Sequence, residues 1–351
     1  MNTIYQKVSA KAVHAEDADA YRTASGILQN GGLVAFPTET VYGLGANALD
    51  EKAAAKIYAA KGRPSDNPLI VHIADMDALP LITAEIPEAA KKLAAKFWPG
   101  PLTMVMRKSD VVPYGTTGGL DTVAVRMPSH PIALEMIRHG GGDIAAPSAN
   151  TSGRPSPTLA SHVADDMTGI IPMILDGGAV GIGIESTIVD LTDEIPTILR
   201  PGFITKEMLQ EVVGEVQIDK GLDADSKTPP KAPGMKYRHY APKAELMIVE
   251  GASEAVVEKI NALVKENEEK GICTGIIGTE ETVSRYPAGI VKCMGTRNDE
   301  LSISSHLYGI LREFDESDEK VIYSESFEEG AMGSAIMNRL LKAAGHKIIH
   351  V

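Results

Sequence analysis

The chain has 351 residues, of which 44% are hydrophobic and 23% are charged, and its formal net charge is -13. This charge disfavours non-specific attraction to nucleic acid or to an anionic membrane. The two cysteines, Cys273 and Cys293, are too few for a zinc site or a disulfide framework. Because the sequence has neither a secretory leader pattern nor an apolar run of about 18 residues, we expect a cytoplasmic protein of about two domains.

Strand and helix patterns alternate through the first part of the chain. Strands are predicted for residues 31–36, 68–73, 102–106, 122–127, 144–146, 173–175, 186–191 and 197–199, and helices for residues 50–60, 86–98, 131–138 and 205–213. Asp50 is a suitable N-cap for the first helix, and Gly62 is a suitable stop. Since some strands follow one another with no helix between them, the pattern predicts an α/β domain with a mixed sheet.

The composition changes near residue 215. Residues 219–240 read DKGLDADSKTPPKAPGMKYRHY, which has no periodic apolar pattern and is typical of a linker. Beyond it, strands are predicted for residues 246–249, 272–277, 291–294 and 321–323, and helices for residues 254–269, 300–314 and 332–344. We therefore predict a catalytic domain over residues 1–215, a linker over 216–243, and a smaller Rossmann-like α/β domain over 244–351.

Two segments of the first domain combine polar and basic side chains. PTETVYGLG, residues 37–45, follows a predicted strand, and open α/β sheets bind ligands at the carboxyl ends of their strands. KGRPSDNP, residues 61–68, pairs Lys61 and Arg63 with a hydroxyl and an amide, which suits a phosphate clamp. The structural alternatives are a turn with polar caps and two cations that complement a helix dipole.

Two further segments carry hydrogen-bonding groups. DTVAVRMP, residues 121–128, places Thr122 and Arg126 on one face of a strand, where Arg126 either meets solvent or binds a carboxylate. APSANTSGRPSPT, residues 146–158, is either a loop that donates to phosphate or ribose oxygens or a polar turn before a helix. With no metal-ligand spacing and no GxSxG elbow, the pattern favours electrostatic catalysis at phosphate over covalent catalysis.

Taken in order, these segments resemble the YrdC-type threonylcarbamoyl-AMP synthases. PTETVYGLG, KGRPSDNPL, WPGPLT, VAVRMP, PSANTSGRPSPT, STIVD and LRPG carry the resemblance, and PGMKYRHYAP with the C-terminal domain is similar to the long, two-domain form. The resemblance implies an open, twisted, mixed sheet flanked by helices. It also implies a nucleotidyltransferase that converts L-threonine, bicarbonate (or CO2) and ATP to threonylcarbamoyl-AMP and pyrophosphate, for the threonylcarbamoyladenosine modification of tRNA.

The resemblance also implies site residues. Those expected to hold threonine are Thr38, His72, Arg126 and Ser186. Those expected around ATP are Lys61, Arg63, Ser65, Thr122, Ala146 (through its backbone), Ser148, Asn150, Ser156, Arg200 and Tyr237, the last on a linker that folds back over the nucleotide. Lys61 and Arg63 are expected to stabilise charge at phosphate. Mg2+ is expected on the ATP phosphates, without protein ligands and without an organic cofactor.

Three alternatives remain open at this stage. The chain could be a carbamoyl-adenylate-forming enzyme of the hydrogenase-maturation type, an RNA-binding module without catalysis, or a sensor that binds ATP without turnover. The net charge argues against the RNA-binding module. We expect a downstream threonylcarbamoyl transferase as a partner and no stable binding to nucleic acid or membrane. The second domain is either a lid for the site or a docking domain.

Overall fold

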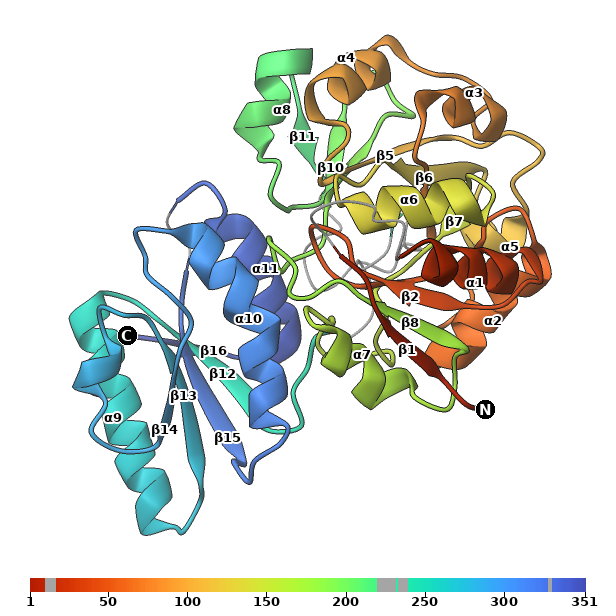
Figure 1. The fold of residues 1–351 in the computed structure, drawn as a ribbon. Helices are drawn as coiled ribbons and strands as arrows, with labels where there is room; N and C mark the ends of the chain where they lie inside the picture. Colours follow the sequence, from red (N-terminus) through yellow and green to blue (C-terminus); the bar gives the residue numbers. More distant parts are fainter. Residues whose placement is uncertain (10–16, 220–231, 233–238, 328–329) are drawn as a thin grey trace. The chain divides into compact units, whose positions relative to one another are not determined.

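The structure is a computed structural model that describes residues 1–9, 17–219, 232, 239–327 and 330–351 (Figure 1). It divides into two compact units. The first contains Met1–Ser152, Ser156–Gly181 and Glu185–Lys236, and the second contains Gly153–Pro155, Ile182–Ile184 and Tyr237–Val351. Among the described residues, no helix has the length and apolar character that a membrane span requires.

An eleven-stranded sheet forms the framework of the first unit. Its order is β1 (Ile4–Lys7), β8 (Met173–Asp176), β2 (Val34–Phe36), β3 (Gly43–Asn47), β7 (Ile144–Ala145), β4 (Ile70–His72), β6 (Thr122–Arg126), β5 (Leu102–Arg107), β9 (Thr187–Asp190), β10 (Thr197–Arg200) and β11 (Gln217–Ile218). Parallel and antiparallel pairs both occur: β4 runs parallel to β6, whereas β5 runs antiparallel to β6. The mixed sheet confirms the predicted fold class.

Helices flank this sheet. They are α1 (Ala18–Gln29), α2 (Glu51–Lys61), α3 (Leu79–Ile82), α4 (Glu88–Phe97), α5 (Tyr114–Thr117), α6 (Pro131–Gly140), α7 (Ala160–Met167) and α8 (Lys206–Val213). The limits of α2 agree with the sequence signals. The Asp50 side chain accepts a hydrogen bond from the Lys52 backbone N–H at 2.9 Å, and the helix ends at Gly62 in the left-handed conformation, with φ of 60°.

The period of two along each strand separates two apolar clusters. Val34 and Phe36 of β2 pack with buried side chains of α1 and α6. Ala35, between them, belongs to the cluster that contains buried side chains of α2, α4 and α7. Successive side chains of a strand point to opposite faces, so helices cover both faces of this part of the sheet.

The central strands present one apolar face and one partly polar face. Val71 of β4 and Val125 of β6 belong to the helix-packed cluster. On the opposite face, a small buried cluster consists of Ile70, Val105, Ala124, Ile188, Leu199 and Ala232. Ala232, which follows the strands of this sheet in the chain, is itself fully buried in this cluster. By alternation, His72 and Arg126 share this face.

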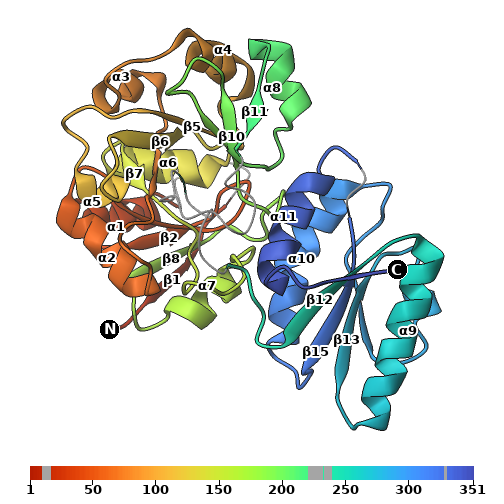
Figure 2. The same cartoon turned by 180° about the vertical axis from the view of Figure 1, so that it is seen from behind.

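A parallel sheet forms the second unit. Its order is β14 (Ile290–Cys293), β13 (Thr274–Gly278), β15 (Val321–Glu325), β12 (Glu245–Glu250) and β16 (Ile348–His350). All of its pairs are parallel. Helix α9 (Ser253–Glu269) lies on one face, and α10 (Glu300–Phe314) and α11 (Gly333–Ala344) lie on the other, as the opposite views of Figures 1 and 2 show. This arrangement confirms the expected Rossmann-like architecture.

Some elements differ from the prediction. The sequence patterns miss β1, α1, β3, α3, α5 and β16. Residues 217–218, which the prediction places in the linker, pair with β10 as β11. The sequence of β3, GLGAN, has low strand propensity, and its place depends on pairing with β2. Residues 220–231 and 233–238 of the predicted linker lie outside the described residues.

Candidate functional site

Three of the predicted threonine-binding residues meet on the partly polar face of the sheet. His72 on β4 lies beside Arg126 on β6, and Arg126 lies beside Thr103 on β5. The Thr103 and Ser186 hydroxyl oxygens are 2.8 Å apart. Since neighbouring strands are only about 4.8 Å apart, the hydrogen-bonded ladder holds these side chains in one row.

The PTET segment, which links β2 to β3, completes this group. Arg126 Nη1 donates a hydrogen bond to the Thr40 hydroxyl at 2.9 Å, and the Thr40 and Thr38 hydroxyls are also 2.9 Å apart. The Thr38 hydroxyl donates to the Val41 carbonyl at 2.7 Å. A chain of hydrogen bonds therefore connects the guanidinium to Thr38, a residue that the sequence analysis assigned to threonine.

Arg126 and Glu39 form a buried ion pair. Arg126 Nη2 lies 2.7 Å from Glu39 Oε1, and the side chains are 4% and 14% exposed. The groups are close but not aligned as a hydrogen bond: among the described residues, Nε and Nη2 of Arg126 and both carboxylate oxygens of Glu39 have no hydrogen-bond partner. Buried polar groups usually have such partners. The pair therefore retains unused donors on one side and unused acceptors on the other.

His72 contributes no charge to this group. Burial, reinforced by the nearby Arg126 guanidinium, lowers the pKa of His72 to about 3. Its Nδ1 lies 3.1 Å from the Ile70 carbonyl, which suits Nδ1–H as a donor. Burial also lowers the pKa of His130, whose Nδ1 has no hydrogen-bond partner in the described part of the chain. The positive charge beside Glu39 thus comes from Arg126, and His72 shapes the site as a neutral ring.

Lys61 joins two of the predicted ATP-binding segments. It is the last residue of α2 and is 2% exposed. Its Nζ donates to the Ser148 carbonyl at 2.5 Å and to the Asn150 carbonyl. The Ser148 hydroxyl donates to Asn150 Oδ1 at 2.6 Å. The KGRP and PSAN segments, far apart in the sequence, are therefore neighbours, and a buried ammonium group lies between them.

Arg63 and Ser65 lie on the loop that follows α2. Arg63 donates from Nε to the Asn67 carbonyl at 3.2 Å and from Nη2 to the Pro68 carbonyl at 3.0 Å. These bonds hold the half-buried guanidinium over its own loop. Ser65 is exposed. The loop brings Arg63 near the end of α2 in a defined conformation, while Ser65 has no such restraint.

Arg200 connects β10 to the row of site residues. Its Nε donates to the Ser186 carbonyl at 3.0 Å, and its Nη2 donates to the Ser186 hydroxyl at 3.1 Å. Ser156, which is fully buried, donates to Glu185 Oε1 at 2.6 Å. The adjacent residues Glu185 and Ser186 therefore bring Arg200 and Ser156 to the same part of the first unit.

The remaining predicted ATP residues occupy separate positions. Thr122 begins β6 and is half-buried, and Ala146 is buried with its backbone N–H donated to the Ile70 carbonyl. Tyr237 lies outside the described residues. The sequence analysis assigned no substrate to Thr40, although its segment was a candidate, and it missed Glu39, Thr103 and Glu185 as members of the site. The sequence feature that could have identified most of them is their position next to predicted site residues. For Thr103, it is the presence of one hydroxyl in an otherwise apolar strand.

Comparisons with known proteins extend over both units. A Sua5–YciO–YrdC family model, described as "Telomere recombination", matches residues 26–202. A model described as "Threonylcarbamoyl-AMP synthase, C-terminal domain" matches residues 204–345. The threonylcarbamoyl-AMP synthase of Pyrococcus abyssi is 52% identical over 94% of this chain and 95% of the relative. That of Bacillus subtilis is 52% identical over 93% of each chain.

A solved structure agrees with these sequence matches. The crystal structure of Pyrococcus abyssi Sua5 in complex with L-threonine has a TM-score of 0.93 at 49% identity, covering 99% of this chain and 100% of that chain. The E. coli YciO structure, with a TM-score of 0.52 at 22% identity, covers 57% of this chain and 96% of that chain and shares the fold alone. The chain therefore belongs to the threonylcarbamoyl-AMP synthase family.

Proposed function

We propose that the protein converts L-threonine, bicarbonate (or CO2) and ATP to threonylcarbamoyl-AMP and pyrophosphate. The observation that carries this proposal is the buried Arg126–Glu39 pair with its unused hydrogen-bonding capacity. An α-amino acid complements both partners, since its carboxylate can accept from Arg126 and its ammonium group can donate to Glu39. A relative with 49% identity whose structure contains L-threonine supports this reading.

The groups around the pair favour an amino acid with a hydroxyl. Thr38 and Ser186 are buried hydroxyl residues at either end of the row, and His72 is a neutral, buried ring. Hydroxyl groups and a neutral imidazole can both donate to and accept from a substrate hydroxyl. A side chain without a hydroxyl would form no hydrogen bond with these groups, so we expect it to bind less tightly than threonine.

ATP is proposed to bind where the basic side chains approach the first unit's polar loops. Lys61, Arg63 and Arg200 supply the positive charge for the triphosphate, and Ser148 and Asn150 supply polar groups beside it. Among the described residues, no cluster of three or more His, Cys, Asp or Glu side chains could hold a metal ion. We propose that Mg2+ enters with ATP as part of the substrate, on phosphate oxygens.

The proposed reaction has two bond-forming steps. The neutral threonine amine attacks the carbon of CO2 and forms the N–C bond, and the nitrogen then loses a proton to solvent, which leaves the carbamate. A carbamate oxygen then attacks the α-phosphorus, and the bond to the pyrophosphate oxygen breaks. Glu39 holds the amine, and Arg126 holds the carboxylate. Lys61 and Arg63 stabilise the negative charge that develops at the phosphate, so the class of reaction is nucleotidyl transfer.

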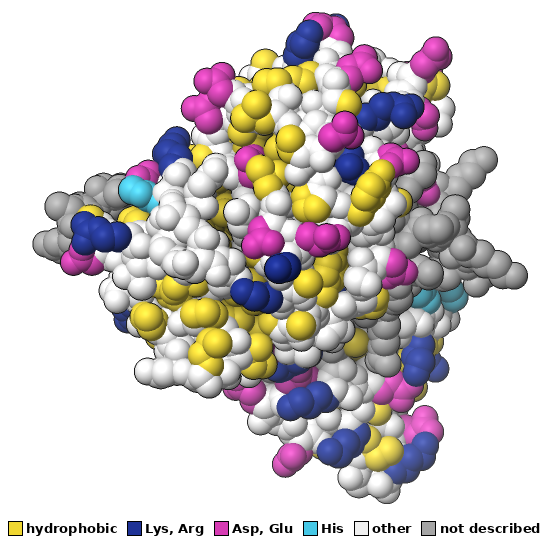
Figure 3. All heavy atoms as spheres, turned by 90° about the vertical axis from the view of Figure 1, so that its right-hand side faces the viewer, with side chains coloured by type: hydrophobic (Ala, Val, Ile, Leu, Met, Phe, Trp, Pro, Cys, Tyr) yellow, Lys and Arg dark blue, Asp and Glu magenta, His cyan; other side chains and the backbone are white. Residues whose placement is uncertain are grey.

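We propose that a separate transferase consumes the product. On the face drawn in Figure 3, Lys and Arg side chains are interspersed with Asp and Glu, and the described residues there form no continuous basic surface. With a net charge of -13, the chain is poorly suited to hold a tRNA itself. A salt-sensitive shift of tRNA by the purified protein would contradict this part of the proposal.

The decisive experiment is pyrophosphate release from ATP by the purified protein, with and without L-threonine and bicarbonate. Release that requires both substrates is the expected result. Release with carbamoyl phosphate in their place would instead identify a carbamoyl-adenylate-forming enzyme. ATP binding without any release would identify a nucleotide sensor and overturn the proposal. L-serine serves as the matched substrate control, because it lacks only the methyl group of threonine.

A further inference from the structure

The second unit contains a cavity of about 350 Å³ at the carboxyl ends of its strands. Glu250 and Glu325 end β12 and β15, Thr282 follows β13, and Arg297 follows β14. The chain leaves β13 toward β14 at one edge of the sheet and leaves β15 toward β16 at the other edge. Ligands of doubly wound sheets bind where connections diverge in this way. The cavity therefore occupies the position at which this architecture holds small molecules.

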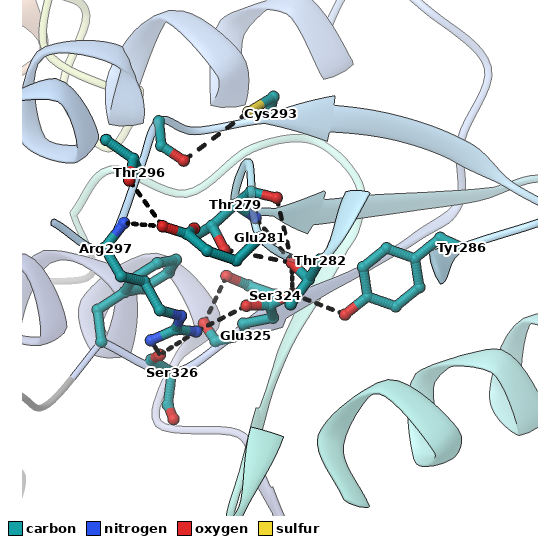
Figure 4. A network of polar contacts seen from close by, with 12 residues as sticks. Thr279, Glu281, Thr282, Tyr286, Cys293, Thr296, Arg297, Ser324, Glu325 and Ser326 are labelled. Carbon is teal, nitrogen blue, oxygen red and sulfur yellow. Dashed lines mark hydrogen bonds and ion pairs between the residues drawn. The ribbon is translucent and has the colours of Figure 1, made fainter. Parts of the chain in front are cut away.

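One wall of the cavity is a fixed carboxylate (Figure 4). Glu325 is 1% exposed, and its Oε1 accepts from the Thr282 hydroxyl and, at 2.7 Å, from the Tyr286 hydroxyl. Its Oε2 lies 2.6 Å from Arg297 Nη2. A buried charge is costly unless it is paired and hydrogen-bonded, and Glu325 is both. These partners hold an ionised group in a defined orientation at the cavity.

The charges that line the cavity do not cancel. Glu250, Glu281 and Glu325 line the cavity together with one guanidinium, that of Arg297. Glu250 Oε2 also lies 2.8 Å from His350 Nδ1, and the three carboxylates outnumber the cations even when this imidazole is protonated. Glu281 Oε1 accepts from the Thr296 hydroxyl at 2.6 Å and from the Arg297 backbone N–H at 3.0 Å. Burial favours the protonated form of Glu281, but hydrogen bonds led by that of Thr296 outweigh it, so its pKa is lowered. A ligand for this cavity must therefore bring positive charge.

A second feature of the cavity favours a negative group. Ser253 and Val256, in the first turn of α9, line the same space. The N-cap of α9 is Ala252, which provides no side-chain hydrogen bond to the first backbone N–H groups. Such uncapped groups, at the positive end of the helix dipole, attract an anion. The cavity is thus lined both by carboxylates and by the start of α9.

We propose that this cavity binds a free α-amino acid. The ammonium group lies against Glu281, and the carboxylate receives hydrogen bonds from the first turn of α9. Phosphate-bearing ligands are disfavoured because three carboxylates line the space. The excess of negative charge further predicts that L-lysine binds more tightly than L-threonine, and L-threonine more tightly than L-glutamate. The site is separate from the proposed synthase site and does not depend on its activity.

Hydrogen–deuterium exchange of the full chain, read by mass spectrometry, tests the proposal. L-lysine should slow exchange in segments 250–256, 279–282 and 296–298. Cadaverine, which has ammonium groups but no carboxylate, and acetate, which has only the carboxylate, are the matched ligand controls and should protect these segments far less. The proposal is overturned if no amino acid protects these segments, or if cadaverine protects them as well as lysine does.

Two variants test the two proposed contacts of the ligand separately. Glu281→Gln should weaken lysine binding about tenfold by removing a charged hydrogen-bond acceptor. Ala252→Asp should also weaken it about tenfold, because its carboxylate would occupy the N–H groups at the start of α9 while stabilising the helix. Glu280→Gln, at an exposed neighbour that does not line the cavity, is the control variant.

The outcomes distinguish this proposal from the proposed function. If Ala252→Asp binds lysine as tightly as the wild-type chain does, the ligand's carboxylate does not bind at the start of α9, and the proposed amino-acid site is overturned. Pyrophosphate release without lysine should be unchanged in all three variants, since none lies in the first unit. A failure of the synthase proposal would appear in that assay with the wild-type chain, whereas a failure here would appear only in exchange.

Discussion

The guanidinium of Arg126 and the carboxylate of Glu39 lie 2.7 Å apart in the interior of the first unit, and each retains unused hydrogen-bonding atoms. If threonine bridges them, Glu39→Gln should raise the KM for threonine about tenfold, because the amide removes the charge that pairs with the ammonium group. Arg126→Lys should raise it at least as much, since an ammonium group cannot donate through two arms. Pyrophosphate release at saturating ATP measures both.

The control for this pair is an exposed one. Arg138 and Glu135 are 3.4 Å apart on the surface of α6, so Arg138→Lys should leave the KM for threonine unchanged. An unchanged KM in Glu39→Gln would mean that the carboxylate only neutralises Arg126 and does not touch the substrate.

Lys61→Ala should abolish adenylation. The variant removes a cation beside the proposed phosphate site and leaves the Ser148 and Asn150 carbonyls without their donor. A loss in kcat of at least about a hundredfold is expected from one missing electrostatic contact to the transition state. Lys56→Ala is the matched control, because Lys56 is also on α2 and also donates to a backbone carbonyl, that of Gly31. Adenylation by Lys61→Ala at the wild-type rate would remove Lys61 from the mechanism.

His72 should make the protein sensitive to acid. Its pKa falls from an ordinary value of 6.5 to about 3 in the folded state, mainly through burial. Between these values the unfolded chain binds more protons, so stability that is fully present above pH 6.5 is lost as pH falls. His72→Gln lacks this titration, and its unfolding free energy should fall less steeply, by up to about 1.4 kcal/mol per pH unit. Parallel stability curves from denaturant unfolding between about pH 5 and 7 would contradict the assignment.

Gly202, in the LRPG segment, should not tolerate a side chain. A Cβ atom there would lie 2.5 Å from the Thr187 backbone nitrogen and 2.8 Å from the Glu185 carbonyl oxygen. Gly202→Ala should cost about 1–3 kcal/mol of stability and, by shifting Ser186, reduce activity as well. Gly26→Ala is the control: nothing lies within 4 Å of its Cβ, and alanine in α1 should stabilise the chain by about 1 kcal/mol. Thermal unfolding compares the two, and equal effects would contradict the steric argument.

The sequence predicted the structure best where the conformation depends only on neighbouring residues in the chain. Asp50 and Gly62 mark the ends of α2, and the alternation in VAVRMP places Thr122 and Arg126 on one face, because caps and strand periods depend on adjacent residues. The sequence predicted the structure least well where a segment becomes a strand only by pairing with a distant part of the chain. GLGAN becomes a strand only because β2 lies beside it, and a lone Thr103 gains meaning only from its neighbours on β6 and β9.

The cavity of the second unit shows the same limit more strongly. Its carboxylates and Arg297 come from four separate strand ends, and no two of the charged residues that line it are adjacent in the chain. No spacing of residues in the sequence could have predicted that these side chains meet. The parallel order of the strands brings them together, because all the carboxyl ends lie at one edge of the sheet.

The row of site residues on β4, β6 and β5 makes errors in the register of these strands costly during folding. Side chains alternate, so a one-residue slip of any of these strands would turn His72, Arg126 or Thr103 into the apolar cluster under the helices and expose Val71, Val125 or Met104 in its place. A misaligned sheet would therefore bury a charge and lose its core together. The residues that we propose to bind substrate therefore also favour the correct alignment of the strands, and a correctly folded first unit is one in which these residues are already side by side.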